Sequence, residues 1–151
     1  MKGHAVKKTL ALAALIAIAA TPALAHPGHG AESFAAGVAH PLTGLDHIAV
    51  MIAVGLWAAL KSGRALWAWP AVFVGVMLAG GALGMAHVAL PLVEPGILAS
   101  VVVLGLMVAL AVDVPVAAGA ALIGVFALLH GHAHGTEIAE NLSGFAYMAG
   151  F

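Results

Sequence analysis

The chain has 151 residues, of which 64% are hydrophobic and 7% are charged, with nine histidines, no cysteine and a net charge of −1. Soluble domains carry about 25% charged residues, so this composition predicts an all-α integral membrane protein. The near-neutral charge and the lack of basic or glycine-rich phosphate-binding motifs argue against nucleic-acid or nucleotide binding. The absence of cysteine excludes disulfides and thiolate metal sites.

Residues 1–25 have the pattern of a cleavable signal peptide. An apolar stretch, Thr9–Ala20, is followed by the small-x-small sequence Ala23-Leu24-Ala25, and the positive charges before it are Lys2, Lys7 and Lys8. The alternative is an uncleaved membrane anchor, but the stretch is shorter than the ~20 residues that a span requires. We therefore expect His26 to begin the mature chain and residues 26–44 to form an external segment.

Four apolar runs follow, separated by proline, glycine and the few charges. They predict full transmembrane helices near Leu45–Leu60, Trp67–His87, Gly96–Val112 and Pro115–His130. A fifth run begins near Leu142 and is cut off at Phe151, below spanning length. The sequence thus predicts a transmembrane domain over residues 45–151 with four full helices and a truncated fifth, incomplete at its C-terminus.

The orientation follows from two basic residues. Lys61 and Arg64 are the only ones after the predicted signal peptide, and the positive-inside rule places their loop in the cytoplasm. Three tryptophans flank this loop, as expected of rings at a membrane interface: Trp57, Trp67 and Trp69. The mature N-terminus is then periplasmic, Asp113 lies in a second cytoplasmic turn, and every histidine except His4 lies at or near the external face.

The string HPLTGLDH, His40–His47, opens the first predicted span. Imidazole and carboxylate groups this close to hydrocarbon are costly unless they bind something. Asp46 has an alternative role in a capping box with Thr43, whereas His47 gains nothing from capping. We take His40, Asp46 and His47 as candidate metal ligands.

The string LHGHAHGTE, Leu129–Glu137, is the stronger signal. If the helix continues through it, His130, His134 and Glu137 share one face and form a donor set for a divalent transition metal. His132 joins them only if the segment unwinds. The alternative is a solvated loop that is rich in histidine by chance.

Three further histidines are weaker candidates. His87 ends the second span, where Gly80 and Gly84 allow a close helix contact that would bring it towards the other histidines. His26 and His29, at the predicted mature N-terminus, form either an external capture site or part of an unstructured tail.

Together, HPLTGLDH at the first span, HGHAHGTE at the end of a later one and a cleavable signal resemble the HupE/UreJ family of bacterial membrane proteins. The resemblance covers the whole mature chain and implies a nickel or cobalt permease linked to hydrogenase and urease gene clusters. It matches His40, Asp46 and His47 to the first family motif, and it matches the histidines and Glu137 of the second string to the second motif. The chain stops before the last spans of the family pattern.

The sequence and the resemblance lead to one functional expectation: an inner-membrane permease that takes up Ni²⁺, or Co²⁺, for hydrogenase or urease maturation. The metal is then a transported ligand, and neither a prosthetic group nor enzymatic activity is expected. A homo-oligomer and a link to maturation proteins remain open. The alternative is an external metal-binding accessory protein without transport. A haem-binding carrier and a metallohydrolase rank lower, because the histidines lie near helix ends and no HExxH motif is present.

Overall fold

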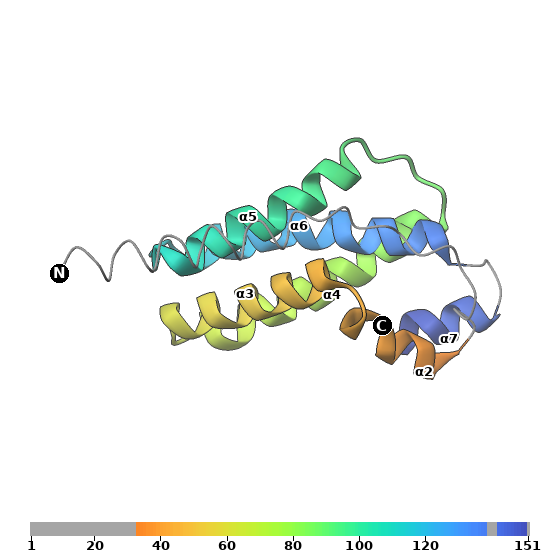
Figure 1. The fold of residues 1–151 in the computed structure, drawn as a ribbon, viewed down its shortest axis with the longest axis horizontal. Coiled ribbons are helices and arrows are strands. Elements are labelled where there is room, and N and C mark those ends of the chain that lie inside the picture. The colour runs from red at the N-terminus through yellow and green to blue at the C-terminus, as the bar shows by residue number, and fades with distance from the viewer. Residues whose placement is uncertain (1–32, 139–141, 151) are drawn as a thin grey trace.

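The computed structural model of the chain describes residues 33–138 and 142–150, and within these ranges it is helical, with no strand. The predicted signal peptide and the candidate ligands His26 and His29 lie outside the described residues. Four long helices run side by side along the long axis of the molecule (Figure 1). They are α3 (Leu45–Lys61), α4 (Ala65–Met85), α5 (Val93–Ala109) and α6 (Val116–Glu137).

Shorter elements lie at one end of these helices. They are α2 (Phe34–Ala39), the 3₁₀ helix η1 (His40–Leu42) and α7 (Leu142–Gly150). Figure 1 shows α2 and α7 next to each other at this end. A methyl group at Gly150 would meet the backbone of α2 at Phe34 and Val38, so the two short helices touch closely. Segments that are 100 residues apart in sequence therefore meet beside the histidine strings.

The four long helices correspond to the four predicted spans, with small differences at their ends. The largest difference is in α6, which continues past His130 to Glu137, so the second histidine string is helical. Two of the described helices, α4 with 21 residues and α6 with 22, are long and apolar enough to cross a membrane, and α5 is apolar but shorter. The number of helices that cross the bilayer therefore remains a prediction.

The outer faces of the helices are apolar. Only 28% of the apolar window of α4 and 39% of that of α6 is buried, unlike the core helix of a soluble protein. Large exposed side chains include Leu56, Leu66, Val74 and Val125. Contiguous apolar surface of this kind is stable only when another apolar phase covers it, and a lipid bilayer meets that requirement.

At the end away from the short helices, the two turns are tied together. Lys61 and Asp113 form an ion pair, and Trp57 donates a hydrogen bond to the carbonyl of Val112 at 2.8 Å. Trp69 makes the matching hydrogen bond to Val116 at 2.9 Å. The turn that holds Lys61 and the turn that holds Asp113 thus lie at the same end, as the predicted topology requires.

These bonds also correct the prediction for the tryptophans. Trp57 and Trp69 are 1% and 0% exposed, and their ring centroids lie 4.5 Å apart in the core. Only Trp67, at 68% exposure, has the exposed position expected of an interfacial ring. The two indoles are buried inside the protein, and the backbone carbonyls of Val112 and Val116 satisfy their N–H groups.

The most extensive contact in the bundle is between α4 and α6, and glycines on both helices make it close. A Cβ atom at Gly84 would lie 2.8 Å from the amide nitrogen of Thr136, and one at Gly131 would lie 2.9 Å from that of Gly81. The backbones therefore touch directly, as predicted for the Gly80-x-x-x-Gly84 sequence. This contact fixes the height of the histidine-bearing part of α6 relative to α4.

Candidate metal centre

The start of α3 gives the first histidine string its shape. Gly44 is the N-cap of α3, and no side chain caps the helix; the Thr43 hydroxyl instead donates to the carbonyl of His40 at 2.8 Å. The capping-box interpretation of Thr43 and Asp46 is therefore wrong. Asp46 lies in the first turn, where its negative charge is favourable to the helix dipole.

Four histidine rings from both strings gather at this end of the bundle. The ring centroid of His47 lies 4.3 Å from that of His134 and 5.0 Å from that of His130. The ring of His40 lies 4.6 Å from His134 and 6.0 Å from His47. We call these four residues, His40, His47, His130 and His134, the histidine cluster. Its members come from η1, α3 and α6.

The helix of α6 explains why His130 and His134 belong to the cluster together. They are four residues apart on a continuous helix, so they lie on one face, as the spacing predicted. Both are buried, at 0% and 8% exposure. Gly131 and Gly135 alternate with them and carry the α4 contact, which brings this face into the interior.

His47 lies at the centre of the cluster, and both its ring nitrogens are engaged. Nδ1 lies 3.2 Å from Asp46 Oδ1, and Nε2 is hydrogen-bonded to Nε2 of His134. A carboxylate can only accept, so Nδ1 of His47 donates to Asp46. The lone pair of Nε2 in a neutral ring then faces the cluster and accepts from His134.

His130 has no such partner. Both of its ring nitrogens are buried, and neither makes a hydrogen bond to any described residue. A fully buried imidazole without a hydrogen bond is costly and needs an explanation, such as a ligand that the residue binds. The His47 ring beside it indicates where such a ligand would lie.

The remaining members of the two strings take other positions. His132 points away from the cluster, and its Nε2 lies 2.6 Å from the carbonyl of Val88 in the α4–α5 loop. Glu137 is exposed at the end of α6. His87 comes shortly after the end of α4 and has a left-handed backbone, with a φ of 54°. Its side chain is exposed, so it is not one of the buried histidines of the cluster.

Tyr147 of α7 is a neighbour of the cluster that sequence reasoning missed. It is 4% exposed, and its ring centroid lies 5.7 Å from that of His40. It is the only tyrosine of the chain, and a polar ring within an apolar run was the available signal. α7 therefore packs beside the cluster at His40, which itself remains partly exposed.

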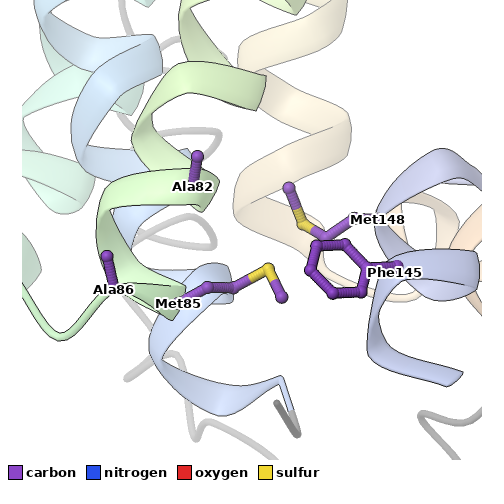
Figure 2. A pocket seen from close by; sticks show the side chains of 5 residues that line it. All are labelled: Ala82, Met85, Ala86, Phe145 and Met148. Atoms are coloured by element: carbon purple, nitrogen blue, oxygen red, sulfur yellow. The ribbon is translucent and has the colours of Figure 1, made fainter. Parts of the chain in front are cut away.

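An apolar pocket of about 610 Å³ lies between the end of α4 and α7 (Figure 2). Its lining residues are Ala82, Met85, Ala86, Phe145 and Met148. It has no imidazole or carboxylate in its lining, so it is separate in chemistry from the histidine cluster.

Within residues 33–138 and 142–150, no three His, Asp or Glu side chains are arranged as a ready set of metal ligands. In the histidine cluster, a hydrogen bond joins Nε2 of His47 directly to Nε2 of His134. An ion that both rings coordinate would have to replace this bond. The cluster thus contains imidazole nitrogens, which are suitable metal ligands, but two of them are hydrogen-bonded to each other.

Comparison with known proteins agrees with the resemblance of the two strings. The family model described as HupE / UreJ protein matches residues 12–151. Protein HupE of Rhizobium leguminosarum bv. viciae is 45% identical over 151 residues, which cover all of this chain and 77% of that protein. No solved structure matches the chain significantly. The chain therefore belongs to the HupE/UreJ family of membrane proteins, which is associated with nickel and cobalt uptake for hydrogenase and urease.

Proposed function

We propose that the chain is a permease of the bacterial inner membrane that takes up Ni²⁺, with Co²⁺ as second substrate, through the histidine cluster at its periplasmic end. The metal supplies hydrogenase or urease maturation. The single observation that carries the proposal is His130, whose two ring nitrogens are buried without a hydrogen bond beside the ring of His47. A transition-metal ion is the ligand that suits imidazole nitrogens in this position.

The donor set fits this substrate. Neutral imidazole binds Ni²⁺, Co²⁺, Cu²⁺ and Zn²⁺ well and binds Mg²⁺ and Ca²⁺ poorly. Preference for nickel among these metals is taken from the family, since the residues alone do not distinguish them. Asp46 acts in this proposal on His47, because a carboxylate that accepts from one ring nitrogen orients the other and increases its basicity.

The entry step follows from the hydrogen bond within the cluster. An incoming ion replaces the bond between His47 and His134, and His134 must lose the proton of Nε2, either to water or by taking the Nδ1–H tautomer. Both Nε2 atoms then have lone pairs for the ion, and His130 supplies a third imidazole. His40, which is less buried than the other three, meets the ion first. Glu137, exposed at the end of α6, contributes negative charge near the entrance.

The core beneath the cluster favours a second candidate, an external metal-binding accessory protein without transport. Between the cluster and the Lys61–Asp113 pair, the buried side chains of the described residues are apolar except for Ser100, and the largest fully buried apolar ones are Trp57, Trp69, Leu104, Ile123 and Val50. The Ser100 hydroxyl donates to the carbonyl of Ile97 in its own helix, and a single hydroxyl does not make a polar path for an ion. A permease must therefore open the bundle or use a further chain, whereas an accessory protein need not.

Accumulation of radiolabelled Ni²⁺ in cells separates these functions. We expect uptake by the wild-type chain and a strong loss in His47→Ala and in His130→Ala, with equal amounts of each protein in the membrane. Met107→Leu is the matched control, because Met107 packs against the core away from the histidines. Uptake that the histidine variants leave unchanged would contradict the permease proposal. Ni²⁺ binding to the purified protein without uptake would identify the accessory function.

A further inference from the structure

Gly44, the N-cap of α3, is a glycine that its backbone does not require. Its φ of −92° and ψ of 121° are extended values that any residue adopts. N-cap positions favour Ser, Asp and Asn somewhat over Gly, because their side chains bond to the first free amides of the helix, and no side chain does so here. The backbone conformation therefore does not require glycine, and glycine is an acceptable but not the best N-cap residue.

The space around Gly44 supplies the reason. A Cβ atom at this position would lie 2.8 Å from Oδ1 of Asp46 and 3.0 Å from Nδ1 of His47. These are the two atoms that form the 3.2 Å hydrogen bond between Asp46 and His47. Carbon atoms do not approach polar atoms this closely without displacement, so any side chain at position 44 would push the pair apart or turn the His47 ring.

We propose that Gly44 is a positioning residue of the metal site. By leaving this space free, it lets Asp46 hold the His47 ring with Nε2 directed at His134 and the cluster. The inference rests on the proposed function in so far as the oriented nitrogen binds metal. Its geometric part concerns the Asp46–His47 pair alone and is measurable without metal.

The variants are Gly44→Ala and Gly44→Ser, with Gly55→Ala as control. Gly55 lies in the same helix, and a Cβ atom there meets nothing within 4 Å. We expect Ni²⁺ affinity of the purified full chain, titrated by calorimetry in detergent, to fall about 10- to 100-fold in both Gly44 variants, the range typical of lost orienting partners. The melting transition should be kept in both variants: the melting temperature should rise slightly in Gly44→Ser, because serine is a better N-cap than glycine, and fall slightly in Gly44→Ala, because alanine is a poorer one.

A double-mutant cycle tests whether Gly44 affects Ni²⁺ binding through the Asp46–His47 pair. In the background of Asp46→Ala, the Oδ1 atom is gone and the His47 ring has room to shift, so Gly44→Ala should weaken Ni²⁺ binding by less than threefold further. Equal losses in both backgrounds would show that Gly44 acts independently of the pair and would overturn the inference. Loss of the melting transition in both Gly44 variants would also overturn it, because the effect is confined to the pair.

The metal-free protein provides a readout that separates this inference from the proposed function. In nitrogen-15 histidine spectra, the signal of His47, assigned by its absence in His47→Ala, should show an Nδ1–H tautomer in the wild type and change in Gly44→Ser. If the wild type binds no Ni²⁺, the proposed function fails and these spectra still decide the role of Gly44. If the wild type binds Ni²⁺ and both affinity and spectrum are unchanged in Gly44→Ser, the inference fails alone.

Discussion

His47 and His134 are 87 residues apart in the chain, yet their Nε2 atoms share a hydrogen bond. This bond joins the first histidine string to the second and links the start of α3 to the end of α6. Each ring has a different support: Asp46 holds His47, and the glycine contact with α4 holds the helix of His134. Four predictions follow from this arrangement and from its surroundings.

Replacing His130 should separate metal binding from folding. In His130→Leu we expect Ni²⁺ affinity to fall at least about tenfold, because a ligand is lost. Stability should stay level or rise by about 1 kcal/mol, because a buried imidazole without a hydrogen bond is replaced by an apolar side chain. Calorimetric titration and thermal melting in detergent measure the two effects. A variant that melts earlier and still binds Ni²⁺ normally would show that His130 is a packing residue.

Replacing His132 should have the opposite effect. Its Nε2 is hydrogen-bonded to the carbonyl of Val88, away from the cluster. In His132→Ala we therefore expect Ni²⁺ affinity within threefold of the wild type. The lost hydrogen bond should lower stability by about 1 kcal/mol. His132→Gln, which keeps a donor, is the comparison that should recover part of this loss. A drop in affinity as large as that of His130→Leu would return His132 to the ligand set.

A methyl group at Gly131 should force α4 and α6 apart. The added Cβ would lie 2.7 Å from the carbonyl carbon of Met77, and backbone atoms cannot rotate away. We expect Gly131→Ala to destabilise the protein by about 1–3 kcal/mol and to weaken Ni²⁺ binding, because the neighbouring His130 shifts with the helix.

The matched control for this substitution is Gly75→Ala in α4, the helix that Gly131 of α6 contacts. A Cβ atom at Gly75 meets nothing within 4 Å, so alanine should leave stability unchanged or raise it by up to about 1 kcal/mol. Thermal melting of the two variants side by side measures the difference. Equal melting temperatures would mean that the two helices are not in direct backbone contact.

The ion pair at the opposite end should matter little to metal binding. The side chain of Lys61 is 25% exposed and that of Asp113 is 79% exposed, so solvent screens their attraction. A double-mutant cycle of Lys61→Ala and Asp113→Ala should give a coupling energy below about 1 kcal/mol, with Ni²⁺ affinity unchanged in each variant. Loss of Ni²⁺ binding in Asp113→Ala would contradict the location of the site at the histidine end.

Much of this arrangement could be predicted from the sequence, because apolar runs and helical spacing act locally. Three of the four long helices were predicted within three residues of their observed bounds, whereas α6 extends well past its predicted end at His130. The shared face of His130 and His134 followed from their separation by four residues. A close helix contact was likewise predicted from Gly80 and Gly84, although the sequence did not indicate that α6 is the partner. Each of these depends on one helix or on one pattern of small residues.

The features that were missed depend on contacts between distant segments. Trp57 and Trp69 were expected at the interface because their nearest sequence neighbours form a loop, but carbonyls more than 40 residues away accept their N–H groups. Tyr147 reaches His40 only because α7 folds back onto α2. The capping box failed because α3 begins one residue later than the pattern requires, with Gly44 as N-cap, and the Thr43 hydroxyl donates to the carbonyl of His40 instead.

The positions of the four cluster histidines along the chain determine when the site can form during synthesis. The cluster members extend from His40 to His134, so α6 leaves the ribosome after α3, α4 and α5. A nascent chain that has inserted only α3, α4 and α5 holds His40 and His47 without the two imidazoles opposite them. The complete donor set therefore forms only after α6 has joined the three earlier helices, and a chain inserted up to α5 cannot hold the ion in the way the four-helix arrangement can.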